Sequence, residues 1–419
     1  MNHVTIKREI RPEIILFFIL IAAVALGNGL SDSIFSNYFK EVYGITALQR
    51  GFIELPRELP GLVCALVFGL LGFLGDLRMA FIAQALSLAG LTALGLFTPA
   101  FGLMLVFLFV NSMGMHLFMP LQDAIGMSMA EKMNVGRRLG QFFSVRSAFG
   151  FLAALLVFFG FRTGFFTFDT QVRWVFLVGS AAFAIALAAT VLMIRRVRPT
   201  RTAARRLKLV FRKEYRYFYL LTILHGVQKQ IAYVYGVWVV VDILLRKADT
   251  LALLFIVVSF LSIFFLPVLG KWMDRYGVRR MMFMEALAFI GVYIVYGAAV
   301  WAITSGKIPA AGWGAWIVYF LFILDRLSMQ MGMVKSVYLR SIAFNEEEIT
   351  STLSMGVSLD HAVSILAALA GGFVWAKFGS HYVFFMAAAF SLGNLYAAFR
   401  ARPGCDEPAR RQSAPACGR

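Results

Sequence analysis

Ionisable side chains lie inside long apolar segments of this 419-residue chain. A charge at the centre of a bilayer costs about 2.5 kcal/mol on insertion scales, so such residues are expected to pair and to serve a function. Acids and bases occur in nearly equal numbers, which favours pairing. The acids are Asp32, Glu54, Glu58, Asp123, Asp325 and Asp360, the bases are Arg57, Arg146, Lys229, Arg326 and Lys335, and the histidines are His116, His225 and His361.

These side chains suit two kinds of chemistry, proton binding and recognition of a polar solute. Burial and a neighbouring base act in opposite directions on the protonation of a carboxylate, so protonation can follow conformation or substrate. A set of static salt bridges is the alternative, although buried ion pairs are poor stabilisers. The predicted proton-coupling residues are Asp32, Asp123, Asp325 and Asp360, and the predicted solute-binding residues are His116, Arg146, His225, Gln228, Lys229, Arg326 and Lys335.

Helical spacing groups three of the charged residues on one face. Glu54, Arg57 and Glu58 recur at i, i+3 and i+4, which aligns them along one stripe of a helix. We interpret this stripe as an outer gate. No pair of histidines has a third ligand on the same face, so no structural metal is expected.

The elements that position these residues are expected to be membrane-spanning helices. The chain is 60% hydrophobic and 15% charged, with a mean hydropathy of +0.77, which is typical of a protein with many spans. Each span needs about 20 residues, and the apolar runs are too long for barrel strands. Twelve helices are predicted, over residues 13–39, 47–74, 79–99, 103–131, 139–162, 172–195, 216–243, 250–269, 280–303, 312–339, 349–375 and 382–400.

The net charge of +18 and the pI of about 10.1 report membrane topology rather than nucleic-acid binding. Lys and Arg concentrate in the segments that face one side, as the positive-inside rule requires of the cytoplasmic side. Both termini are therefore expected in the cytoplasm. The absence of an N-x-[ST] sequon favours a bacterial inner membrane.

The chain divides into two related halves. The predicted parts are an N-terminal six-helix bundle (1–195), a basic cytoplasmic linker (196–215), a C-terminal six-helix bundle (216–400) and a cytoplasmic tail (401–419). Residues 144–155 match residues 358–369 at six of twelve positions, as expected of a duplicated transporter. In this repeat Arg146 is equivalent to Asp360, so equivalent positions carry opposite charges, which suggests ion pairs between the halves.

A glycine-rich signature recurs on two short loops between apolar runs. The second copy, GKWMDRYGVRR at 270–280, is complete, whereas the first lacks the last glycine and the base after it. This repeated Gly-x-x-x-Asp pattern resembles the helix 2–3 and helix 8–9 loops of the major facilitator superfamily. The resemblance covers the whole chain. It implies a cytoplasmic latch formed by Gly72, Asp76, Arg78, Gly270, Asp274, Arg275, Gly277, Arg279 and Arg280.

The resemblance also implies an all-α membrane protein with twelve helices in two pseudo-symmetric six-helix bundles. In that fold, helices 1, 4, 7 and 10 line a central cavity. The implied function is secondary transport of a small polar or anionic organic solute, driven by a proton gradient without a cofactor. Proton-coupled export of amphipathic compounds is the alternative. The protein is expected to be a monomer that contacts lipid and solute but not nucleic acid, and no catalytic constellation indicates an enzyme.

Overall fold

The computed structural model describes residues 12–129, 135–196, 212–344 and 346–401, which form helices and contain no β-strand. Two of the twelve predicted segments, 250–269 and 280–303, both lie in α9 (Ala248–Thr304), and the other ten each coincide with one helix or with a run of helices. In chain order these are α1 (Pro12–Asp32), α2 (Phe35–Tyr43), α3 (Ala47–Leu71), η1 (Gly72–Leu74), α4 (Asp76–Leu96), α5 (Phe101–Met129), α6 (Val135–Arg162), α7 (Trp174–Arg196), η2 (Lys213–Tyr215), α8 (Arg216–Gln230), η3 (Ile231–Gly236), η4 (Val239–Ile243), α9 (Ala248–Thr304), α10 (Trp313–Gln330), η5 (Met331–Met333), α11 (Val334–Ile342), α12 (Glu346–Lys377) and α13 (Ser380–Arg400).

The described residues contain ten helices that are long and apolar enough to cross a membrane. This is therefore a multi-pass membrane protein. The two predicted segments outside this set are 47–74 and 216–243. The first, α3, carries Arg50, Glu54, Arg57 and Glu58 within nine positions. The second, α8, is succeeded by two π-helical stretches, η3 and η4.

Local residue choice explains several helix ends. Pro12 occupies the first position of α1, where its missing N–H would have no partner inside the helix. The first predicted helix is broken at residues 33–34, and α2 then ends at Gly44. Gly44 has φ 59°, and its N–H donates to Lys40 O at 3.1 Å. Glycine adopts this left-handed conformation without steric cost.

The two signature loops share one backbone conformation. Gly75 has φ 74° and ψ 161°, and Gly277 has φ 77° and ψ 158°. Gly277 interrupts the helical geometry of α9 and separates the two spans that this helix contains. The equivalence is therefore between Gly75 and Gly277. Asp76 follows its glycine, in the first turn of α4, whereas Asp274 precedes its glycine.

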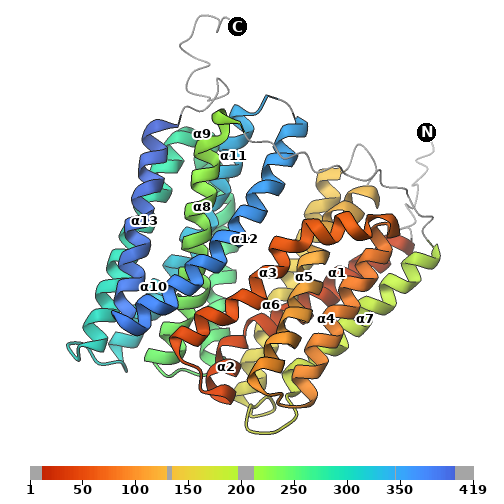
Figure 1. Cartoon of the computed structure of the whole chain (residues 1–419), viewed down its shortest axis with the longest axis horizontal. Coiled ribbons are helices and arrows are strands. Elements are labelled where there is room, and N and C mark those ends of the chain that lie inside the picture. The colour runs from red at the N-terminus through yellow and green to blue at the C-terminus, as the bar shows by residue number, and fades with distance from the viewer. Residues whose placement is uncertain (1–11, 130–134, 197–211, 345, 402–419) are drawn as a thin grey trace, which may run out of the picture. The chain divides into compact units, whose positions relative to one another are not determined.

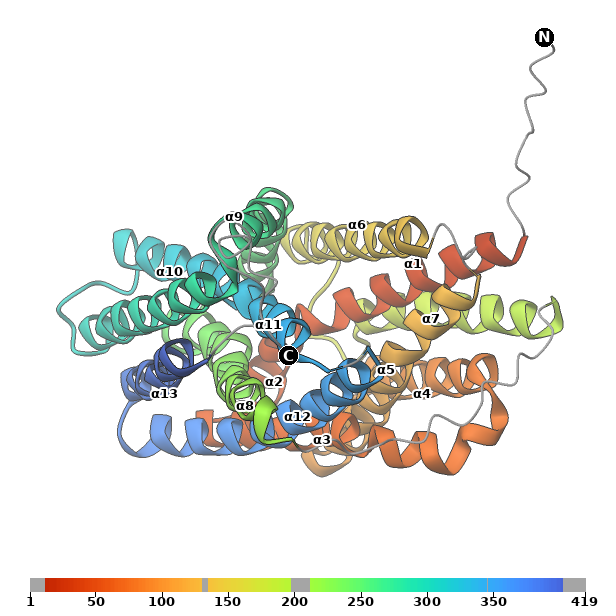
Figure 2. The same cartoon turned by 90° about the horizontal axis from the view of Figure 1, so that it is seen from above.

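The chain forms two compact units. In the first unit, α4 packs on α5 and α7, and α1 packs on α6 and α7. The second unit contains residues 33–62 together with the C-terminal helices. In it, α8 packs on α12 and α13, and α9 packs on α10 and α13; Figures 1 and 2 both show α12 (blue) running beside α8 (green).

This division differs from the predicted halves in one respect. Residues 33–62 belong to the first half by sequence, yet α2 and the first part of α3 pack with the second half. Most of the predicted linker (197–211) and tail (402–419) lies outside the described residues.

Candidate functional site

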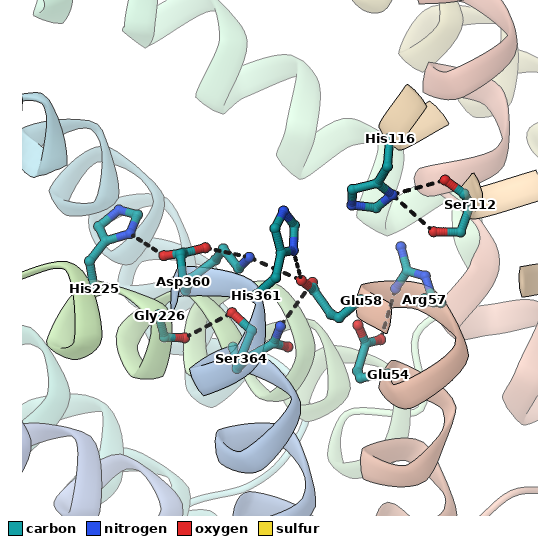
Figure 3. Close-up of polar contacts among 12 residues, drawn as sticks. Glu54, Arg57, Glu58, Ser112, His116, His225, Gly226, Asp360, His361 and Ser364 are labelled. Carbon is teal, nitrogen blue, oxygen red and sulfur yellow. Dashed lines mark hydrogen bonds and ion pairs between the residues drawn. The ribbon is translucent and has the colours of Figure 1, made fainter. Parts of the chain in front are cut away.

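Glu58 on α3 accepts hydrogen bonds from three side chains of the second unit. Lys229 Nζ lies 3.2 Å from Glu58 Oε2, and His361 Nδ1 lies 2.6 Å from the same oxygen. Gln230 Nε2 donates to Glu58 Oε1 at 3.0 Å. Figure 3 shows the Glu58 carboxylate pointing toward His361. One carboxylate thus connects α3 to both α8 and α12.

Asp360 on α12 extends these contacts. Lys229 Nζ donates to Asp360 Oδ2 at 2.8 Å, so the ammonium bridges two carboxylates. His225 Nδ1 lies 3.2 Å from Asp360 Oδ1 (Figure 3). We call His225, Asp360, Lys229, Glu58 and His361 the polar network. Its ionic side chains are between 11% and 20% exposed, so water screens them only partly.

Sequence spacing and glycines bring the polar network together. His225 and Lys229 are four residues apart on α8 and share a face. A Cβ on Gly61 would lie 2.6 Å from the His361 ring, so only glycine permits α3 to approach α12 this closely. Ser364 on α12 donates to Gly226 O of α8 at 3.5 Å. The helices therefore meet without bulky side chains between them.

The polar network contains two carboxylates but one ammonium group. Two carboxylates share the single ammonium of Lys229, and each also contacts one histidine. The network therefore carries a net charge of −1 when both histidines are neutral. A proton on either carboxylate would remove this excess and weaken the grip of that carboxylate on Lys229.

A second set of contacts holds α2 and α3 in the second unit. Glu54 accepts from Arg50 and from Arg57, the latter at 2.8 Å. Lys40 pairs with Asp242. The predicted stripe of Glu54, Arg57 and Glu58 is thus divided: Glu54 pairs within its own helix, and Glu58 reaches other helices.

Asp325 and Arg326 lie side by side on α10 and face the π-helical segment η3. Asp325 is 0% exposed and Arg326 is 4% exposed. The Arg326 guanidinium carbon lies 3.9 Å from the centroid of the Tyr233 ring of η3. A Cβ on Gly236 of η3 would lie 3.3 Å from Asp325 Oδ2. None of the side-chain nitrogens of Arg326 has a hydrogen-bond partner among the described residues.

Tyrosines of α9 support the π-helical segment. A π-helix shifts the backbone ladder and displaces carbonyl groups from their usual partners. Tyr296 donates from its hydroxyl to Gly236 O, and Tyr293 donates to Gln228 O, both at 3.2 Å. Tyr293 and Tyr296 are fully buried. They fix the segment that faces Asp325 and Arg326.

Four predicted site residues belong to the first unit. Asp123 on α5 and Arg146 on α6 are exposed, attract each other electrostatically and line one small pocket with Phe142. His116 Nδ1 donates to Ser112 O at 2.9 Å, which is a local contact within α5 (Figure 3). Asp32 is exposed at the end of α1.

Two other predicted solute-binding residues belong to the second unit but are not part of the polar network. Gln228 is 0% exposed and donates from Nε2 to Ser391 Oγ and Asn394 Oδ1, each at 2.9 Å, so its amide nitrogen is occupied by α13. Lys335 on α11 interacts electrostatically with Asp360 and with Glu285.

Glu285 on α9 was missed in the sequence analysis. It is 3% exposed and lies within a membrane span. Applying the rule of charges inside apolar segments to residues 280–303 would have found it.

The loop signature contributes contacts at the end of α13. Arg279 donates from Nη2 to Phe399 O at 3.1 Å, and a cation is favourable at a helix C-terminus. Arg275 lies over the ring of Tyr276. Arg78 and Arg280 are exposed, and a Cβ on Gly270 would meet open space. Gly72 begins η1, and the side chain of Asp274 lies outside the described part of the chain.

Solved structures share this arrangement of helices. A mutant form of the nucleoside transporter NupG matches with a TM-score of 0.73 and 13% identity, over 92% of this chain and 99% of its own. An auto-inhibited peptide transporter of the POT family matches with 0.71 and 16%, over 96% and 99%. The xylose transporter XylE from E. coli, in an inward-open conformation, matches with 0.68 and 13%, over 94% and 97%. The chain has the major facilitator fold.

Comparison of sequences alone does not detect the similarity to these proteins. No protein-family model matches the chain, and no curated protein sequence matches it significantly. The predicted fold is confirmed, because the likeness to transporters of the major facilitator fold extends over nearly the whole chain. The three solved proteins are transporters and not enzymes.

Proposed function

We propose that this protein is a secondary transporter that moves a small polar or anionic organic solute by alternating access, with protons as the coupling ion. The observation that carries the proposal is the polar network. A carboxylate of α3 that is only 14% exposed is held by donors from α8 and α12, and charges withdrawn from water in this way are costly. The fold and the transport functions named for the similar structures support the same class of function.

Proton coupling enters through Glu58. While Glu58 is ionised, it attracts Lys229 and binds α3 to α8 and α12. A proton on Glu58 removes that attraction and leaves Lys229 with Asp360 alone. We therefore infer that protonation loosens α3 and that deprotonation closes it again.

We further propose that the protein acts as a monomer in a bacterial inner membrane, with both termini in the cytoplasm. The excess of basic residues in one set of loops supports this orientation.

The test uses purified protein in liposomes and a radiolabelled set of sugars, nucleosides, carboxylates and amino acids. An acidic outer solution should drive accumulation of one of these classes. In Glu58→Gln, exchange of that solute should persist, whereas accumulation should be lost because the amide binds no proton. Accumulation by Glu58→Gln equal to that of the wild type would refute the coupling role. Solute extrusion driven by the same gradient would instead assign the export alternative.

Glu54→Gln is the matched control. Glu54 lies one helical turn before Glu58 and is also buried, but it pairs with Arg50 and Arg57 of its own helix. This variant should still accumulate the solute under a proton gradient. Equal loss of accumulation in both variants would mean that any buried acid of α3 is required, against a specific role of Glu58.

A further inference from the structure

Arg326 is the buried cation whose hydrogen-bonding capacity is least used. Its Nε, Nη1 and Nη2 atoms are inaccessible to water and have no acceptor among the described residues. Five donor positions of a guanidinium are thus unsatisfied at 4% exposure. A buried polar group without a partner destabilises the folded protein, and it does so more strongly if it is charged. Such a group calls for a ligand.

Three aromatic rings surround the guanidinium of Arg326. Its carbon lies 3.9 Å from the centroid of the Tyr233 ring, 5.0 Å from that of Phe322 and 5.4 Å from that of Phe255. Aromatic rings bind a guanidinium through their faces and accept no regular hydrogen bond from its edges. The rings hold the fork in place, and its N–H edge suits the two oxygens of a carboxylate.

The other cations that were predicted to bind the solute are less suited than Arg326 to bind a carboxylate. Lys229 is shared by Glu58 and Asp360, and Arg146 faces Asp123. Lys335 has no ion pair within 4 Å among the described residues, but its ammonium lacks a planar fork.

Asp325 adds a condition on the ligand. Its carboxylate is also fully buried, and the groups that face it are Arg326, Tyr293 and Tyr296. An anion bound to Arg326 would neutralise the cation that now balances Asp325. A second negative charge in this apolar setting is costly unless Asp325 takes up a proton.

We propose that Arg326 binds the carboxylate group of a small organic anion and that Asp325 accepts one proton when the anion binds. No bond other than the O–H bond on Asp325 is formed, and the proton comes from solvent. The site is closed in the conformation described here, so the anion enters in another state of the cycle. This inference rests on the proposed transport function and narrows its substrate to organic anions.

The test is calorimetric titration of the purified full chain with acetate, benzoate and inorganic phosphate, with benzyl alcohol as the neutral probe. A carboxylate should bind to the wild type. Loss of a charge-assisted, bidentate contact of about 1.5–3 kcal/mol should weaken binding by at least tenfold in Arg326→Gln. Lys307→Gln removes a cation that also lies 3.9 Å from a ring centroid, that of Trp301, but outside the proposed site, and it should keep the wild-type affinity within about threefold.

Titration in two buffers with different ionisation heats counts the protons taken up on binding. The wild type should take up about one proton per anion, and Asp325→Asn should bind the anion with no uptake. Arg326→Lys keeps the positive charge but lacks the planar guanidinium, and it serves as the test variant if Arg326→Gln does not fold. The proposal is overturned if no carboxylate binds the wild type, if Arg326→Lys binds as the wild type does, or if Asp325→Asn takes up the same proton.

The outcome is separable from that of the transport test. If the wild type accumulates a solute under a proton gradient and Arg326→Gln accumulates it equally, the anion site is wrong and the transporter assignment stands. If carboxylates bind as described but no solute crosses the membrane, the anion site stands and the transport function is wrong.

Discussion

Lys229 is the residue of the polar network that contacts both carboxylates. Its ammonium lies 2.8 Å from Asp360 Oδ2 and 3.2 Å from Glu58 Oε2. Two carboxylates at this separation from one cation repel each other, and Lys229 is the cation that contacts both of them. The stability of the second unit should therefore depend on Lys229 more than on either acid.

A double-mutant cycle tests this dependence. Lys229→Met should lower the free energy of unfolding by about 3 kcal/mol, because it leaves two partly buried carboxylates without a base. Adding Asp360→Asn should recover about 1–3 kcal/mol, since one of the two charges is then removed. The measurement is chemical unfolding in detergent, followed by circular dichroism.

Lys377→Met controls for the loss of a lysine, because Lys377 is exposed near the end of α12. It should change stability by no more than about 0.5 kcal/mol. If the effects of Lys229→Met and Asp360→Asn simply add, the bridging geometry described here is wrong.

At the scale of single residues, the sequence predicted which side chains belong to the site better than it predicted which side chains contact each other. The rule that charges inside apolar segments must pair identified Glu58, Lys229 and Asp360. It could not show that Lys229 bridges both acids, because partners more than a hundred residues apart depend on helix rotation and depth. For the same reason, Gln228 looked like a solute ligand, although its amide faces α13.

At the scale of elements, glycines decide how closely α3 approaches α12. The Cβ that Gly61 lacks would lie 2.6 Å from the His361 ring, and Gly372 on α12 faces the start of α3. Contacts between small residues are a common basis of helix association in membranes. A side chain at Gly61 would displace the His361 ring from the polar network, whereas one at Gly372 requires only a slight shift of the α3 backbone.

Gly61→Ala should therefore displace His361 from Glu58. We expect a loss of about 1–3 kcal/mol in the free energy of unfolding, as is typical of overpacking. The matched control is Gly291→Ala in α9, where an added Cβ meets no atom within 4 Å. There the better helix propensity of alanine should leave stability unchanged or raise it by up to about 1 kcal/mol. Thermal unfolding of both variants decides; equal melting temperatures would show that the α3–α12 approach is not tight.

Helix existence was more predictable than helix irregularity. Apolar runs predicted a helical segment at all twelve places, although α3 and α8 are not both long and apolar enough to count among the ten candidate spans of the described residues. The break after Asp32, the π-helical stretches after Gln230 and the 3₁₀ turn at Met331–Met333 carry no comparable signal. They depend on tertiary partners such as Tyr296, whose hydroxyl binds Gly236 O. The ring of His225 likewise fills the space beside Gly332.

At the scale of the whole molecule, the sequence repeat predicts two halves, whereas the contacts group residues 33–62 with the second half. These residues are α2 and the first part of α3, and they are held there by Glu58, Lys40 and Asn37. We interpret them as a gate that belongs to the first half by chain connection and binds the second half reversibly. Hydropathy could not reveal this, because it does not report on contacts between segments.

A reversible disulfide tests that gate most directly. A Cβ on Gly372 would lie 3.3 Å from Leu48 Cα, so a Leu48→Cys/Gly372→Cys pair can bridge α3 and α12. Cys64, Cys405 and Cys417 are replaced first. A second pair, Gly226→Cys/Val363→Cys, joins α8 to α12 and serves as the control, since a Cβ on Gly226 would lie 3.3 Å from Val363 Cβ and these helices belong to the same half.

The decisive measurement is solute transport in liposomes before and after reduction of the α3–α12 disulfide. We predict that the oxidised protein is inactive, that reduction restores transport, and that the control disulfide has little effect. Bridge formation slows at low pH in any variant because the thiolate is lost, but the decline should be steeper in the wild type than in Glu58→Gln, since only in the wild type does protonation of Glu58 release Lys229. Transport at the full rate with the α3–α12 bridge closed would contradict the account, because α3 would then not need to leave α12 in any step of the cycle.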